Sequence, residues 1–121
     1  MIIIDTSAWI DHFRGRDTAI PELLESRLAL LHSSVLCELL LSGLPRDDPV
    51  VKELRDLPAA PLVSADDARE LIVSAELAGT GIGYVDAHLL ASARAFPEGR
   101  LLTHDKRLSE QADRLGILFQ Q

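Results

Sequence analysis

Short apolar runs alternate with longer segments of helical period along the whole chain, and this alternation constrains the fold more than any other feature. The runs occupy residues 2–4, 28–31, 62–63, 100–103 and 117–119. Short apolar runs bounded by turn residues are typical of buried strands. Strands that alternate with helices form a parallel sheet covered by helices. The sequence therefore predicts an α/β fold built on a parallel sheet.

Polar residues mark two of the expected helix starts. Asp48 precedes Pro49, which gives a capping carboxylate followed by a proline in the first turn. Ser64 is followed three residues later by Asp67, and this pair resembles a capping box. We therefore expect helices to begin directly after Asp48 and Ser64.

The length and composition favour one globular unit. A chain of 121 residues can bury a core of its own but is too short for two independently stable domains. Its 47% hydrophobic and 26% charged residues are typical of globular rather than disordered proteins. We expect a single domain over residues 1–121.

Membrane insertion and secretion are not expected. The longest apolar stretch, residues 35–44, is interrupted by Glu38, Ser42 and Gly43. It is shorter than the roughly 20 residues that span a bilayer. The first residues lack the basic start and the apolar region of a secretory signal. The sequence therefore predicts a cytoplasmic protein.

Metal sites built from sulfur or imidazole are also not expected. Cys37 is the only cysteine, which excludes an internal disulfide and zinc sites made of paired thiolates. We expect it to be a small core residue. The histidines lack metal-motif spacing and are predicted to be surface or helix-end residues: His12, His32, His88 and His104.

The net charge of −7 argues against a general nucleic-acid binder, since phosphate backbones are usually met by clustered Lys and Arg. The objection weakens if some carboxylates hold divalent cations where a phosphate must bind. The only short basic clusters are Arg14 with Arg16 and Lys106 with Arg107. Most such pairs are merely solvated, but Lys106 and Arg107 directly follow Asp105 and are candidates to meet a phosphate.

Two acids follow predicted strands. Asp5 comes directly after residues 2–4, and Asp105 comes two residues after residues 100–103. Ligands of open parallel sheets bind beyond the carboxyl ends of the strands, so both acids would face one crevice if these strands are neighbours. Each acid has a plainer alternative as a helix cap, and for Asp105 that alternative is the stronger.

Glu38 lies inside an apolar helix. Residues 35–37 and 39–41 on either side are apolar, so the helix has almost no polar face for a carboxylate. No Lys or Arg lies within a helical turn of Glu38. A buried carboxylate without a partner is costly, which favours a metal-binding or catalytic role. The alternative is a rim position with the carboxylate in solvent.

Asp86 falls in the first turn of another predicted helix. Three glycines in residues 79–83 are expected to end the helix over residues 65–78 and to link it to a helix that begins at Tyr84. An acid in a first turn also complements the helix dipole, so Asp86 alone is a weak indication of a site.

Four carboxylates at one place require bound cations. Each pair about 5 Å apart would repel by roughly 3 kcal/mol at an effective dielectric near 20. A ligand set made only of oxygens indicates hard ions and suits Mg²⁺ or Mn²⁺, which retain several waters. Two such ions stabilise the attacking and leaving oxygens of phosphodiester hydrolysis. The sequence therefore predicts a metal-dependent nuclease.

The arrangement of these motifs resembles the PIN-domain ribonucleases, and within them the VapC-type toxins of bacterial toxin–antitoxin pairs. The likeness covers nearly the whole chain and rests on Ile3-Ile4-Asp5-Thr6-Ser7, on Glu38 in its apolar helix, on Val85-Asp86-Ala87-His88-Leu89-Leu90-Ala91, and on Leu102-Thr103-His104-Asp105-Lys106-Arg107-Leu108. The resemblance assigns catalytic and metal-site roles to Asp5, Glu38, Asp86 and Asp105. It assigns supporting hydrogen bonds to Thr6 and Thr103.

The resemblance also implies properties that composition cannot give. These are a PIN-like three-layer fold with a five-stranded parallel sheet between helices, a homodimer, dependence on Mg²⁺ or Mn²⁺, endonucleolytic cleavage of RNA, and inhibition by a cognate VapB-type antitoxin bound over the active site. Only 4% of the residues are aromatic, so no stacking platform for single-stranded RNA is evident. Substrate selection would then rest on shape and backbone contacts.

Two other functions of small α/β proteins do not fit the positions of the acids. A phosphoacceptor receiver domain would need an acid pair after the first strand and another acid after the third, but Asp5 is single and residues 62–64 hold no acid. A haloacid-dehalogenase-type phosphatase would need an aspartate at Ser7. Two alternatives stay open: a structure-specific DNA nuclease with the same site, and a catalytically idle PIN-like module that binds a partner.

Overall fold

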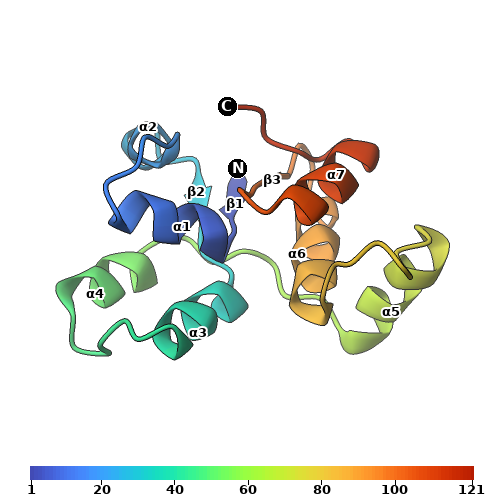
Figure 1. Ribbon diagram of the computed structural model, residues 1–121, viewed down its shortest axis with the longest axis horizontal. Helices are drawn as coiled ribbons and strands as arrows, with labels where there is room; N and C mark the ends of the chain where they lie inside the picture. The colour runs from blue at the N-terminus through green and yellow to red at the C-terminus, as the bar shows by residue number, and fades with distance from the viewer.

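A computed structural model describes all of residues 1–121 and contains a parallel sheet of three strands. The central strand β1 (Ile2–Ile4) lies between β2 (Ala29–Leu30) and β3 (Arg100–Leu102) (Figure 1). Both neighbours pair with β1 in parallel, and Ile3 lies opposite Leu30 and Leu101. All three residues of β1 are buried, as expected for a parallel strand covered on both faces. The predicted α/β class is confirmed.

The prediction of five strands is wrong in number. Residues 62–63 form no strand, and the sheet is extended on that side only by a single parallel bridge between Leu31 and Ala59. Pro58 and Pro61 flank this bridge, and proline has no N–H with which to continue a ladder. On the other side, residues 117–119 contribute one bridge, between Leu118 and Leu101. Five segments are thus aligned in parallel, but only three are strands.

Seven helices surround the sheet. They are α1 (Thr6–Phe13), α2 (Ile20–Glu25), α3 (Ser33–Leu41), α4 (Pro49–Arg55), α5 (Ala65–Ser74), α6 (Tyr84–Arg94) and α7 (Lys106–Arg114). Figure 1 shows α1 to α4 on one side of the strands and α5 to α7 on the other. Between them lies one apolar core of 27 buried residues, to which all three strands contribute. None of the helices combines the length and apolarity needed to cross a membrane.

The predicted helix starts are confirmed. Asp48 accepts a 2.9 Å hydrogen bond from the Val50 N–H at the start of α4, and Ser64 accepts one of 3.0 Å from the Asp67 N–H at the start of α5. Helix α6 begins at Tyr84 as expected.

Helix α5 ends at Ser74, four residues before the predicted end at residue 78. Glu76 adopts a left-handed φ of 53°, and the Leu77 N–H returns to the Ile72 carbonyl. This closure ends the helix before the glycines of the link are reached.

The prediction that Cys37 is a core residue is wrong. Helix α3 buries Val35 and Leu39, which lie four residues apart on one face. Residue 37 lies halfway between them and so falls on the opposite side of the helix, where Cys37 is exposed. His32 is a helix-end residue as predicted, because its Nδ1 accepts a hydrogen bond from the Ser34 N–H at the start of α3. It is also buried, and burial together with the nearby charge of His88 lowers its pKa.

Candidate active site

Asp5 is held by hydroxyl groups at the carboxyl end of the central strand. It is only 5% exposed. It occupies the position before α1, but its side chain makes no capping hydrogen bond. Instead its Oδ2 accepts hydrogen bonds from Ser7 Oγ at 2.9 Å and from Thr103 Oγ1 at 2.8 Å. The capping alternative for this side chain is therefore wrong, and both bonds leave Oδ1 uninvolved.

Ser7 is a member of this group that sequence reasoning missed. Its hydroxyl donates to Asp5 and accepts a 3.0 Å hydrogen bond from the His104 N–H. It also lies 3.2 Å from Thr103 Oγ1, but the hydroxyl protons of both residues are already directed at Asp5. The one available indication was a hydroxyl two residues after an acid that follows a strand.

Glu38 is joined to the start of α1. Thr6 Oγ1 donates a 2.7 Å hydrogen bond to Glu38 Oε1. Thr6 directly follows Asp5, and Glu38 lies on α3, which packs against α1. The carboxylate is half-buried, as the apolar surroundings in the sequence predicted. The supporting role expected of Thr6 thus has a definite contact, and it directs Glu38 toward the end of the strand that carries Asp5.

Asp86 interacts electrostatically with the other three acids. Its Oδ2 accepts a 2.9 Å hydrogen bond from the Gly83 N–H, which closes the first turn of α6. Burial raises the pKa of Asp86, the negative charges of Asp5, Asp105 and Glu38 raise it further, and the Gly83 N–H opposes this change. Asp86 is therefore both an acid in the first turn of α6 and a neighbour of the three other carboxylates, and both were predicted.

Asp105 is the most peripheral of the four acids. It is exposed, and its Oδ1 accepts a 3.0 Å hydrogen bond from the Leu108 N–H at the start of α7. Its own N–H donates to Thr103 Oγ1 at 3.1 Å. The capping alternative is thus realised for one oxygen, while Oδ2 is not used by the cap. Thr103 connects Asp105 to Asp5 through a single hydroxyl.

The four acids gather at one end of the sheet, but they do not form a complete set of ligands by themselves. No three acidic, histidine or cysteine side chains are close enough together to hold one ion. The donors at this end are carboxylate and hydroxyl oxygens, which is the chemistry that Mg²⁺ and Mn²⁺ prefer. Mg²⁺ typically uses one or two carboxylates and keeps several waters. The residues therefore fit such an ion with water completing its coordination.

A second polar network ties α1 to the segment between β3 and α7. His104 Nδ1 lies 2.6 Å from Asp11 Oδ2, and Arg16 Nη1 lies 2.5 Å from Asp11 Oδ1. The hydrogen bond with His104 lowers the pKa of Asp11 most, and the bond with Arg16 lowers it further. Sequence reasoning treated His104 as a surface or helix-end residue and did not find this pair, because its partner lies 93 positions away.

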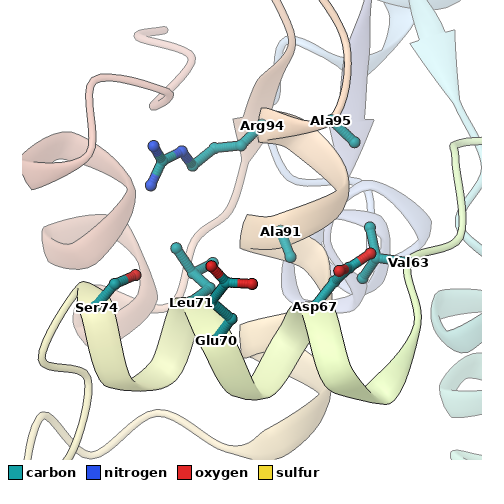
Figure 2. Close-up of a pocket in the computed structure, with 8 residues that line it drawn as sticks. All are labelled: Val63, Asp67, Glu70, Leu71, Ser74, Ala91, Arg94 and Ala95. Carbon is teal, nitrogen blue, oxygen red and sulfur yellow. The ribbon is translucent and has the colours of Figure 1, made fainter.

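A cavity between α5 and α6 is separate from the acids. Its volume is about 300 Å³, and its lining is shown in Figure 2: Val63, Asp67, Glu70, Leu71, Ser74, Ala91, Arg94 and Ala95. None of these is a predicted site residue. Arg94 ends α6, whereas Asp86 lies in its first turn, so about 12 Å of helix separates them. The carboxylates, rather than this cavity, carry the chemistry that the sequence predicts.

Comparison with known proteins identifies the family of the chain. Residues 2–114 match the PIN domain family. The chain is 38% identical over 117 residues to the protein named Ribonuclease VapC32 of Mycobacterium tuberculosis, in both strain CDC 1551 and strain H37Rv, over 97% of this chain and 94% of the relative. The crystal structure of PAE2754 from Pyrobaculum aerophilum shares the fold, with a TM-score of 0.56 and 14% identity over 92% of this chain and 78% of that one. The chain therefore belongs to the PIN domain family, in the branch of the VapC ribonucleases.

Proposed function

We propose that this protein is a metal-dependent endoribonuclease that acts as the toxin of a type II toxin–antitoxin pair. One observation carries the proposal: Asp5, Glu38 and Asp105 lie close enough to Asp86 for their negative charges to raise its pKa. The likeness to Ribonuclease VapC32 over nearly the whole chain supports RNA as the substrate. The reaction would be hydrolysis of RNA phosphodiester bonds.

In this proposal Asp5, Glu38, Asp86 and Asp105 hold Mg²⁺ or Mn²⁺, one or two of them directly and the others through bound water. When bound, the metal would lower the pKa of the attacking water and offset the negative charge of the scissile phosphate. Ser7 and Thr103 orient Asp5, since both donate to the same oxygen and leave the other without a hydrogen bond. Thr6 does the same for Glu38. Hydroxyl donors of this kind fix a carboxylate before the ligand arrives.

We also propose that the protein works in the cytoplasm as a homodimer and that a cognate VapB-type antitoxin inhibits it. The family membership supports a partner of this kind. An uncovered group of carboxylates is in addition a receptor for an arginine or lysine side chain when metal is scarce. The antitoxin would then present a basic side chain to the acids.

Incubation of the purified protein with total RNA and with DNA tests the proposed function. Each substrate is supplied with Mg²⁺, with Mn²⁺ or with a chelator, and the Asp5→Asn variant is run beside the unmodified chain. Asp113→Asn, which removes an exposed charge from the last turn of α7, is the matched control. We expect cleavage of RNA with either metal, and none with the chelator or with Asp5→Asn.

Two other results would replace the proposal. Metal-dependent cleavage of DNA alone would establish the structure-specific DNA nuclease. A well-folded protein that cleaves neither polymer with either metal would indicate a PIN-like module that only binds a partner. Cleavage that survives both the chelator and Asp5→Asn would show that the acids are not the active site.

A further inference from the structure

Arg107 lies directly against the backbone of Gly81. Gly81 belongs to the link between α5 and α6, and Arg107 lies in the first turn of α7. A Cβ atom on Gly81 would fall 2.7 Å from Arg107 Cδ, 2.9 Å from Nη1 and 3.1 Å from Nε. Real Cβ atoms essentially never come within 3.0 Å of another heavy atom, so a side chain at residue 81 would displace the flexible end of Arg107. Gly81 also has a φ of +86°, which favours glycine.

This contact joins two segments that each carry one of the acids. Arg107 lies two residues after Asp105, and Gly81 lies two residues before Gly83, whose N–H binds Asp86. The arginine is thus supported by both segments that deliver these two acids to the end of the sheet. Arg114 of α7 also contacts this link, where its guanidinium donates a hydrogen bond to the Ala75 carbonyl.

The charge of Arg107 is not used within the protein. It is exposed and forms no ion pair with any carboxylate. It is also absent from the charges that act on Asp86. An exposed arginine without an internal partner is suited to an external anion, and its planar guanidinium matches phosphate in two hydrogen bonds.

We propose that Arg107, seated against Gly81, binds a backbone phosphate of the RNA strand next to the carboxylate site. The inference rests on the proposed function. The chain has a net charge of −7, so it repels a polyanion such as RNA unless positive charge lies at the binding site. Arg107 would supply such a charge. The metal would offset charge at the scissile phosphate, and Arg107 would contact a neighbouring phosphate and fix the position of the strand.

Salt-dependent binding of single-stranded poly(U) tests the role of Arg107. Fluorescence anisotropy of labelled poly(U) is followed over a series of KCl concentrations at constant Mg²⁺, in an Asp5→Asn background that prevents cleavage. Arg107→Ala is expected to weaken binding several-fold and to reduce the slope of log K against log salt by about 0.7, the value for one contact with a single strand. Arg94→Ala, which removes an exposed arginine at the far end of α6, should leave the slope unchanged. Equal slopes for the two variants would overturn the proposal.

A pair of glycine variants tests the role of Gly81. Gly79 has a similar φ of +78°, but nothing lies within 4 Å of a Cβ built on it. Gly79→Ala and Gly81→Ala therefore introduce the same kind of backbone strain, and only the second displaces Arg107. We expect Gly81→Ala to weaken poly(U) binding and Gly79→Ala to preserve it. An equal loss of poly(U) affinity in both variants would show that binding depends on the conformation of the link and not on the contact between Gly81 and Arg107.

Failure of this inference is distinct from failure of the proposed function. If the unmodified chain cleaves RNA and Arg107→Ala keeps the full salt slope, only the phosphate contact is wrong. If the unmodified chain cleaves no RNA, the proposed function itself is wrong. Lack of poly(U) binding by the Asp5→Asn background, with RNA cleavage by the unmodified chain intact, would likewise overturn the contact.

Discussion

Thr103 donates a 2.8 Å hydrogen bond to Asp5 across 98 positions of sequence. The two residues meet because β1 and β3 are neighbours in register, and each residue directly follows its strand. The same Thr103 hydroxyl accepts the N–H of Asp105. One buried side chain thus joins the first of the four site acids to the last, so its removal should affect both Asp5 and Asp105.

Replacement of Thr103 by valine should lower the free energy of unfolding by about 1–3 kcal/mol, because the Asp105 N–H loses its acceptor and Asp5 loses a donor. Ser7→Ala removes the other donor to the same Asp5 oxygen. The double variant measures how strongly the two hydroxyls depend on each other. Urea unfolding without metal gives these values. An unchanged unfolding free energy in Thr103→Val would show that this hydrogen bond contributes nothing net.

Neutralising Asp86 or Glu38 should remove activity without unfolding the protein. Asp86→Asn relieves repulsion from three other carboxylates and the cost of burying a charge, so the metal-free variant should be as stable as the unmodified chain or more so. Glu38→Gln keeps an oxygen that can accept from Thr6. RNA cleavage and urea unfolding are measured on the same preparations. If Glu38→Gln unfolds, Glu38 is a structural residue and its assignment to the site is wrong.

The raised pKa of Asp86 also fixes the sign of its pH dependence. The folded state binds this proton more tightly than the unfolded chain, whose pKa is near 3.8. The contribution of Asp86 is therefore most favourable below pH 3.8 and is lost as pH rises through the higher folded value. The stability advantage of Asp86→Asn over the unmodified chain should accordingly grow over that interval and then stay constant. An advantage that shrinks with rising pH would reverse the assigned shift.

The sequence was sufficient where the relevant contacts are local. Asp48 and Ser64 cap the helices that begin directly after them. Residues 2–4 and 100–102 form strands, as their short apolar runs predicted. It was insufficient where a partner lies far along the chain. Local patterns could not distinguish Ala59 from residues 62–63 as the neighbour of β2, because the sheet edge is selected by tertiary packing.

The same distinction applies within the site. The positions of Asp5 and Asp105 after strands, of Asp86 in a first turn and of Glu38 inside an apolar helix could be anticipated, but the bonds that orient these acids could not. Ser7 is recognisable only once β3 brings Thr103 and His104 beside it. Cys37 was misplaced for a different reason: in a helix that is apolar on nearly every side, composition does not determine which face is buried.

The pair formed by Asp11 and His104 predicts a measurable change in a single carboxyl group. The hydrogen bond with His104 lowers the pKa of Asp11 more than the bond with Arg16 does. His104→Ala and Arg16→Ala should therefore each raise the Asp11 pKa toward 3.8. Titration of the Asp11 side chain by NMR measures both variants. An Asp11 pKa that does not change in His104→Ala would show that the histidine does not control this carboxylate.

The last prediction concerns the inhibitor. If an antitoxin presents an arginine or lysine to Asp5, Glu38 and Asp86, the basic group and the metal compete for the same oxygens. Antitoxin affinity should then fall as Mg²⁺ or Mn²⁺ is raised at constant ionic strength, which calorimetric titration with a co-purified partner would follow. Replacing MgCl₂ by KCl at equal ionic strength separates this competition from general screening. Affinity that is independent of metal, together with a complex in which nothing basic approaches these acids, would show that the antitoxin inhibits without contacting the site.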